Sequence, residues 1–140
     1  MAKLASDTAM VMAAGLGKRM RPLTATMPKP MVRVAGKPLI DHTLDRLAEA
    51  GVARAVVNVH YLADALEAHV RTRKIPAVEI SDEREELLET GGGMIRAQDR
   101  LPDPFFCLNS DNIWLDGPRD VFTELSRGWD PDEMDALLLM

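Results

Sequence analysis

The stretch MAAGLGKRMRPLTATMPKP, residues 12–30, decides how this chain folds and what it can bind. It continues an apolar run and carries two glycines, Gly15 and Gly17, with Lys18 and Arg19 directly after them. Glycine allows positive φ and lets backbone N–H groups approach a ligand closely. Successive N–H groups in such a turn form a concavity that binds anions. A strand, a glycine turn and adjacent cations, in this order, predict a cradle for a polyphosphate.

Two well-known phosphate-binding loops fit this stretch poorly. The dinucleotide fingerprint G-x-G-x-x-G needs a third glycine where Met20 stands, which weakens an oxidoreductase interpretation. The P-loop G-x-x-x-x-G-K-[ST] needs a glycine where Met12 stands and a magnesium-binding hydroxyl where Arg19 stands. The remaining alternative without a ligand is a plain strand-to-helix turn with surface lysines.

The segments that follow alternate between strand and helix patterns. Residues 39–50, for example, carry apolar side chains at helical spacing, and Gly51 follows them as a C-terminal cap. The sequence predicts strands at residues 8–14, 55–59, 77–81, 104–109 and 136–140, helices at residues 39–50, 61–72, 90–100 and 118–126, and a long irregular segment at residues 15–37. This alternation implies an α/β fold with a Rossmann-like, mainly parallel sheet flanked by helices.

Three candidate residues follow strands of that sheet. Gly15 follows the first strand, His60 the second and Asp111 the fourth. Because ligands of open α/β sheets bind beyond the carboxyl ends of the strands, we expect these residues at one edge. The acidic run that contains Glu83 and Glu86 is interpreted as a solvated surface segment, and a site role for His60 stays open.

Composition narrows the class of partner. The chain has 140 residues and a formal net charge of −5, while its positive residues gather between Lys18 and Lys37. A local basic site on an acidic chain suits a small anion better than nucleic acid, which binds broad basic surfaces. No apolar run approaches the ~18 residues of a membrane span, and no signal peptide is evident, so we expect a cytoplasmic location and no membrane partner. Cys107, the single cysteine, lies in an apolar run and is expected to be a buried, inert thiol.

Several motifs together resemble the sugar-phosphate nucleotidyltransferases, which join a nucleoside triphosphate to a sugar 1-phosphate and release pyrophosphate. The motifs are G-x-G-x-R at residues 15–19, P-L-T at 22–24, P-K-P at 28–30, A-G-K-P-L-I at 35–40, L-E-T-G-G-G at 88–93 and N-S-D at 109–111. The L-E-T-G-G-G form, with N-V-H-Y-L at residues 58–62, is most similar to the N-acetylmuramate 1-phosphate uridylyltransferases. Mannose-1-phosphate guanylyltransferases are the next most similar, so UTP is favoured and GTP remains the alternative.

The resemblance implies a nucleotidyltransferase (GT-A-like) fold and a role for each matching residue. Arg19 and Lys29 would be catalytic, Arg19 on the β- and γ-phosphates and Lys29 on the α-phosphate and the sugar phosphate. The nucleotide-binding set that it implies is Ala13, Ala14, Gly15, Gly17, Lys18, Arg19, Gly91 and Gly92. Asp111 would bind Mg²⁺, since a hard cation takes one or two carboxylates besides substrate phosphates. An Asx turn at Asp111 is the alternative.

The resemblance also implies that residues 1–140 are the N-terminal, nucleotide-binding portion of a single nucleotidyltransferase domain. The C-terminal part of such a domain supplies a second metal-binding aspartate and much of the sugar pocket. We therefore expect little transferase activity from these residues alone, and association with another copy through the apolar strand at residues 136–140. A non-catalytic nucleotide-binding regulatory unit is the remaining alternative function.

Overall fold

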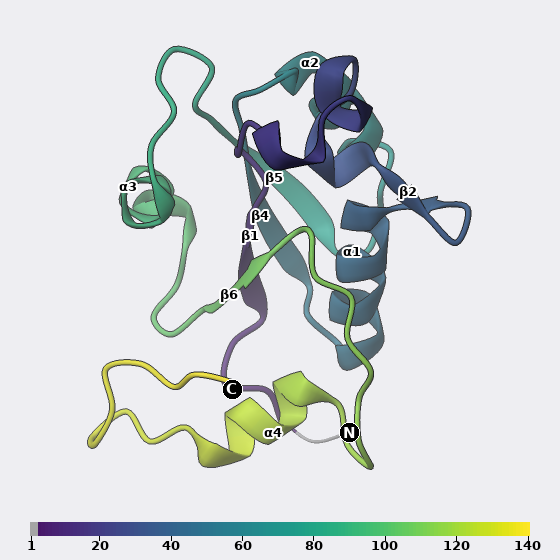
Figure 1. The fold of residues 1–140 in the computed structure, drawn as a ribbon. Helices are drawn as coiled ribbons and strands as arrows, with labels where there is room; N and C mark the ends of the chain where they lie inside the picture. Colours follow the sequence, from purple (N-terminus) through teal and green to yellow (C-terminus); the bar gives the residue numbers. More distant parts are fainter. Residues whose placement is uncertain (1–2) are drawn as a thin grey trace.

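A computed structural model describes residues 3–140 of the chain. Its centre is a four-stranded sheet in the order β5-β4-β1-β6. The strands are β1 (Thr8–Met12), β4 (Arg54–Val59), β5 (Ala77–Asp82) and β6 (Phe106–Asn109). Every neighbouring pair is parallel, so all four strands end at the same edge of the sheet (Figure 1).

Helices cover both faces of this sheet. They are α1 (Leu39–Ala50), α2 (Ala63–Val70), α3 (Thr90–Arg96) and α4 (Val121–Gly128). On one face, Leu44 of α1 and Leu66 of α2 join Val57 in the main core cluster. On the other face, Met94 of α3 packs against the smaller cluster that contains Met10, and Figure 1 shows α3 across the sheet from α1. The inner strands β1 and β4 are thus covered on both sides, which explains their nearly continuous apolar sequence.

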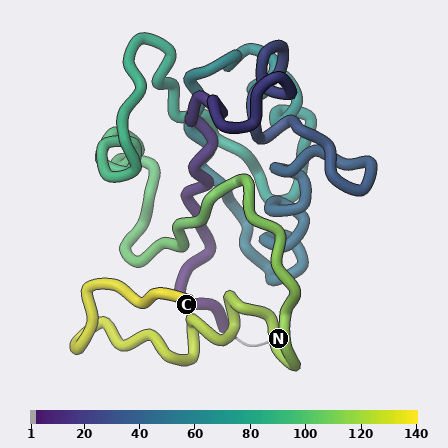
Figure 2. The backbone as a smooth tube through the Cα atoms, in the orientation of Figure 1, coloured from purple at the N-terminus to yellow at the C-terminus, as the bar shows by residue number. Residues whose placement is uncertain are grey.

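The long segment at residues 15–37 is irregular, as the sequence predicts. It contains three short 3₁₀ turns, Lys18–Met20, Leu23–Ala25 and Lys29–Met31, and a hairpin of β2 (Arg33–Val34) and β3 (Lys37–Pro38). Figure 2 shows the backbone leaving the end of β1, turning through this segment and then entering α1. The segment therefore lies over the same end of the sheet at which the strands finish.

The predicted α/β architecture is confirmed, and most element boundaries differ from the expected ones by a few residues. The strand predicted at residues 136–140 is wrong. These residues are irregular, and Leu138, Leu139 and Met140 are exposed. A strand needs a neighbour for its backbone hydrogen bonds, and within residues 3–140 this segment pairs with none of the strands. Association with another copy stays a prediction. No helix within residues 3–140 is long and apolar enough to cross a membrane.

The burial predicted for Cys107 is also wrong, since its side chain is exposed. The physical reason is position: β6 is an edge strand, and its faces are less covered than those of the inner strands. Partial desolvation of the thiol still raises the pKa of Cys107 above its ordinary value. The thiol therefore stays protonated at neutral pH, which agrees with an inert role.

Candidate functional site

The carboxyl end of β1 is held by its two neighbouring strands. The Ala13 N–H donates a hydrogen bond of 2.6 Å to Asn58 Oδ1 on β4. On the other side, the N–H and the hydroxyl of Ser110, directly after β6, donate to the Met12 carbonyl over 3.2 and 2.9 Å. These contacts, two of them made by side chains, provide hydrogen-bond partners for the backbone of β1 beyond the end of the strand. They explain why β1 ends at Met12, two residues earlier than predicted, although Ala13 and Ala14 are still buried.

A cavity of about 500 Å³ lies at this edge of the sheet. Its lining consists of residues 12–20, Lys29, Pro30, Asn58, residues 87–90 and residues 109–111. Eight of the ten residues predicted for the site therefore meet in one cavity: Ala13, Ala14, Gly15, Gly17, Lys18, Arg19, Lys29 and Asp111. The other two, Gly91 and Gly92, follow the lining segment 87–90 in the first turn of α3 but are not part of the lining.

The glycine loop is held by a chain of hydrogen bonds behind it. Gly17 has a φ of +64°, and its carbonyl accepts a 2.6 Å hydrogen bond from the hydroxyl of the buried Thr24. The Thr24 carbonyl in turn accepts a 2.6 Å hydrogen bond from the Tyr61 hydroxyl. A side chain at Gly17 has no room, because a Cβ there would lie 2.9 Å from Thr24 Cγ2 and 3.2 Å from Lys29 Cβ. At Gly15 a Cβ would meet nothing within 4 Å.

The cations of the cavity are of two kinds, one paired with a carboxylate and two without an ion pair among residues 3–140. Lys29 Nζ and Asp111 Oδ2 form an ion pair of 2.6 Å, and both side chains are about 30% exposed. Lys18 and Arg19 are exposed, and none of the ion pairs found within residues 3–140 involves them. Two exposed cations of the cavity are thus available to an anionic ligand, while the third, Lys29, is paired with Asp111.

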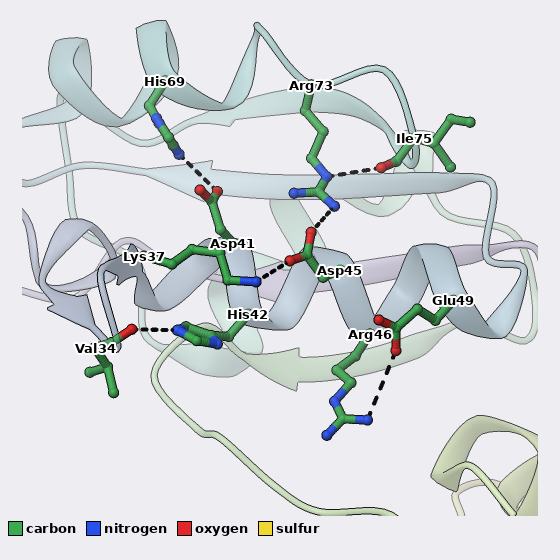
Figure 3. A network of polar contacts seen from close by, with 10 residues as sticks. All are labelled: Val34, Lys37, Asp41, His42, Asp45, Arg46, Glu49, His69, Arg73 and Ile75. Carbon is green, nitrogen blue, oxygen red and sulfur yellow. Dashed lines mark hydrogen bonds and ion pairs between the residues drawn. The ribbon is translucent and has the colours of Figure 1, made fainter.

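Another member of the predicted basic group, Lys37, has a structural partner away from this cavity. Figure 3 shows Lys37 and Arg73 on either side of Asp45, on the outer face of α1. The Lys37–Asp45 distance is 2.5 Å, and Arg73 contacts the other carboxylate oxygen. Desolvation acts to raise the pKa of Asp45, but the hydrogen bonds from Lys37 and Arg73 hold that pKa below its ordinary value. Lys37 therefore fastens the hairpin to α1.

The interpretation of the acidic run as a solvated segment is wrong for Glu83. This side chain is 1% exposed. Its Oε2 accepts a 2.8 Å hydrogen bond from the Asn58 amide, and its Oε1 accepts a 3.0 Å hydrogen bond from the Leu88 N–H. A buried carboxylate needs such donors, and here they come from another strand and from the cavity wall. Asn58 is the one polar residue in the buried part of β4, residues 55–59, which is the only sequence signal of this contact.

His60 follows β4 as predicted but does not belong to the cavity lining. Its ring Nδ1 lies 2.6 Å from the Glu83 carbonyl oxygen. Because a carbonyl oxygen can only accept, Nδ1 carries the proton in this contact. His60 therefore supports the segment after β5.

Comparisons with known proteins agree with this geometry. The family model described as "Nucleotidyl transferase" matches residues 8–127. Over 97% of its length the chain is 51% identical to an N-acetylmuramate alpha-1-phosphate uridylyltransferase of Caulobacter vibrioides, of which it spans 58%. It is 38% identical, over 75% of its length, to a mannose-1-phosphate guanylyltransferase catalytic subunit beta of Danio rerio, of which it spans 31%. A crystal structure of UDP-glucose pyrophosphorylase complexed with UDP-glucose superposes with a TM-score of 0.76 at 19% identity, over 87% of this chain and 52% of that one. This last likeness supports the fold alone.

The contrast between the two glycines gives a direct test of the loop. We expect Gly17→Ala to lower the free energy of unfolding by at least about 1–2 kcal/mol, the usual cost of a left-handed conformation for a residue with a Cβ. The clash with Thr24 adds to that cost. Gly15→Ala should change stability by no more than about 0.5 kcal/mol. Urea unfolding of both variants measures the difference, and equal stabilities would contradict the loop conformation.

Proposed function

Because this chain belongs to the nucleotidyl transferase family, we propose that it is the nucleotide-binding part of a uridylyltransferase that acts on a sugar 1-phosphate. The sugar phosphate proposed is N-acetylmuramate 1-phosphate, after the relative that is 51% identical. Such an activity belongs to the recycling of cell-wall sugars in the cytoplasm. The chain spans 58% of that relative, so the activity, the substrates and the location are all parts of the proposal.

The observation that carries this proposal is the composition of the cavity at the strand ends. One cavity of about 500 Å³ combines a glycine loop, the cations Lys18, Arg19 and Lys29, and the carboxylate of Asp111. Cations and backbone N–H groups suit phosphates, and the Asp111 carboxylate beside Lys29 suits a metal ion that phosphates share. A nucleoside triphosphate offers the matching set of negative charges.

In the proposed reaction, a phosphate oxygen of the sugar 1-phosphate attacks the α-phosphorus of UTP. The bond between the α-phosphorus and the bridging oxygen breaks, pyrophosphate leaves with the electron pair, and a UDP-sugar forms. Such transfers depend on positioning and on stabilisation of charge more than on covalent help from the protein. The chain's contribution is therefore to hold the phosphates in line and to neutralise them.

The cations divide this work between them. The exposed Arg19 guanidinium can hold the β- and γ-phosphates, because it offers two parallel hydrogen bonds to phosphate oxygens. Lys29 lies deeper, next to Asp111, where its ammonium can neutralise the α-phosphate and the incoming sugar phosphate. Pro28 and Pro30 fix the backbone on both sides of Lys29 and limit how far it can move.

Asp111 fits a magnesium ion as one ligand among several. Among residues 3–140 no group of three or more His, Cys, Asp or Glu residues could hold a metal ion by itself. A site of this kind suits Mg²⁺, which takes one or two carboxylates besides water and substrate phosphates. When bound, the ion would neutralise charge on the phosphates. In the structure the Asp111 carboxylate is neutralised by Lys29 instead, so both side chains must exchange partners when substrate binds.

The segment at residues 87–90 forms a part of the cavity lining separate from the glycine loop, and we assign the nucleobase to this segment. Leu87, Leu88, Glu89 and Thr90 line the cavity, and Gly91 and Gly92 follow directly. Backbone groups of this segment can form hydrogen bonds with the edge of a base, and such recognition requires no particular side chain in the sequence. The choice of uracil over guanine rests on the similarity to the uridylyltransferase.

Nucleotide binding is the first test of the proposal. In isothermal titration, UTP with MgCl₂ should bind this chain at one site, with GTP weaker and NAD weaker still. Bound UTP should also raise the melting temperature, since free ligand at about 100 times its Kd stabilises a protein by about 2.7 kcal/mol. Preference for NAD, or no binding of any nucleotide, would overturn the proposal. Binding with no pyrophosphate release from the whole protein would favour the non-catalytic alternative.

Arg19 has a matched control two residues away. We expect Arg19→Ala to lower turnover by about 10²–10³, the usual cost of losing one donor that stabilises charge in the transition state. Arg21 is also exposed but does not line the cavity, so Arg21→Ala should leave turnover nearly unchanged. The measurement is pyrophosphate release from UTP and N-acetylmuramate 1-phosphate, in a form of the protein that supports turnover. Equal losses of turnover in Arg19→Ala and Arg21→Ala would contradict the proposed role of Arg19 on the β- and γ-phosphates.

Asp111→Asn separates the metal role from the turn role. Asparagine keeps the shape and forms the same Asx turn, but it lacks the charge that Mg²⁺ requires. If Asp111 binds the ion, the variant should fold normally and need far more Mg²⁺ for UTP binding and turnover. The check is a Mg²⁺ titration of both proteins. Superimposable curves would show that Asp111 forms the Asx turn and does not bind the ion.

A further inference from the structure

A buried pair of polar side chains lies behind the cavity, where sequence reasoning expects a solvated acidic run. Asn58 and Glu83 are each 1% exposed, and Asn58 Nδ2 donates to Glu83 Oε2 over 2.8 Å. The remaining polar atom of each side chain faces a backbone N–H. Asn58 Oδ1 accepts from Ala13 over 2.6 Å, and Glu83 Oε1 accepts from Leu88 over 3.0 Å.

These four groups form one continuous path, Ala13 to Asn58 to Glu83 to Leu88. Ala13 belongs to one lining segment, residues 12–20, and Leu88 to another, residues 87–90; these segments are the two walls of the cavity. Ala13 and Leu88 are far apart in the sequence, but the side chains of Asn58 and Glu83 connect their backbones by hydrogen bonds. The buried Ala13 N–H needs a partner, and the part-buried Leu88 N–H finds one at the other end of the path. The path therefore holds the backbone of both lining segments.

The polarity of the path admits one arrangement. A backbone N–H can only donate and a carboxylate can only accept, so the Asn58 amide must turn its oxygen to Ala13 and its nitrogen to Glu83. The two side chains are also closely packed against α3. A Cβ at Gly93 of α3 would lie 3.0 Å from Asn58 Nδ2 and 3.1 Å from Glu83 Oε2, which shows how closely the helix backbone approaches the pair.

We propose that Glu83 is a positioning residue, which sets the separation of the two cavity walls through its hydrogen bonds to Asn58 and to the Leu88 N–H. Only the consequence for nucleotide affinity rests on the proposed function. Glu83 touches no substrate in this role. It acts by holding the backbone at Ala13 and Leu88 in the arrangement that a nucleotide between them requires.

Glu83→Gln tests the proposal with almost no change of shape. Glutamine offers one acceptor oxygen where the carboxylate offers two, so either Leu88 or, after a flip of Asn58, Ala13 must lose its acceptor. The exposed Glu86 provides the matched control, Glu86→Gln. We expect the amide of Ala13 or of Leu88 to exchange about tenfold faster with solvent in Glu83→Gln, in line with the loss of one hydrogen bond. The UTP Kd should rise about 10-fold to 100-fold, the range by which loss of a hydrogen-bond partner behind the direct ligands weakens a metal site.

A reversed pair provides the rescue. In the double variant Asn58→Asp with Glu83→Gln, the glutamine nitrogen can donate to the new carboxylate and the glutamine oxygen can accept from Leu88. The other oxygen of the carboxylate still accepts from Ala13, so every donor again has an acceptor at unchanged net charge. Protection of both amides and the UTP affinity should therefore return toward the parent values.

Amide exchange by NMR and UTP titration of the parent, the single variants and the double variant decide the matter. Unchanged protection at Ala13 and Leu88 in Glu83→Gln would overturn the proposal. A double variant that folds but is not rescued would overturn it too, because the polarity of the path would then not be the cause. If the parent fails to bind UTP, the proposed function falls, while the exchange rates still test the positioning of the two walls.

Discussion

The termination of β1 is the constraint on which the rest of the site depends. An inner strand of a parallel sheet is buried on both faces, and its backbone needs partners even after the ladder ends. Here Asn58 accepts from Ala13 on one side, and Ser110 donates to the Met12 carbonyl on the other. The two neighbouring strands thereby position the start of the glycine loop. Because Asp111 follows Ser110 directly, the same contact brings the carboxylate into the cavity.

Much of this arrangement could be predicted from local patterns. Continuous apolar runs identify the strands, helical spacing identifies α1, and the alternation of the two implies a parallel sheet with one ligand-binding edge. The residues that follow strand ends, Gly15 and Asp111, are therefore placed correctly by chain order alone. The motif similarity adds Lys29, which lies in the irregular segment, where hydrophobic periodicity predicts neither a helix nor a strand. Gly91 and Gly92 lie just beyond the lining, since α3 begins before them and takes them into its first turn.

The remaining features depend on tertiary partners that no local pattern contains. Glu83 stands in a run of acidic residues, and its burial depends on donors outside that run, above all the amide of Asn58, 25 positions earlier, together with the Leu88 N–H. Cys107 lies in an apolar run, but its exposure depends on β6 being an edge strand, which is a property of the strand order. Residues 136–140 have a strand-like composition without a neighbouring strand to pair with. In each case the sequence gives the propensity of a segment, and the outcome depends on which other segment lies beside it.

The cavity combines a hydrogen-bonded floor with an exposed rim, and these need different kinds of residue. Its floor contains the buried, hydrogen-bonded side chains of Asn58 and Ser110, and Glu83 lies behind Asn58. Its rim carries Lys18 and Arg19, which are exposed and can adjust to the phosphates that arrive. Such a division lowers the entropy lost on binding, because only the rim has to be ordered. Lys29 is intermediate between the buried floor and the exposed rim, and its ion pair with Asp111 holds it in place. A phosphate that competes for the Lys29 ammonium would also release the Asp111 carboxylate. One contact thus couples the arrival of the ligand to the exposure of the group that the proposed metal ion needs.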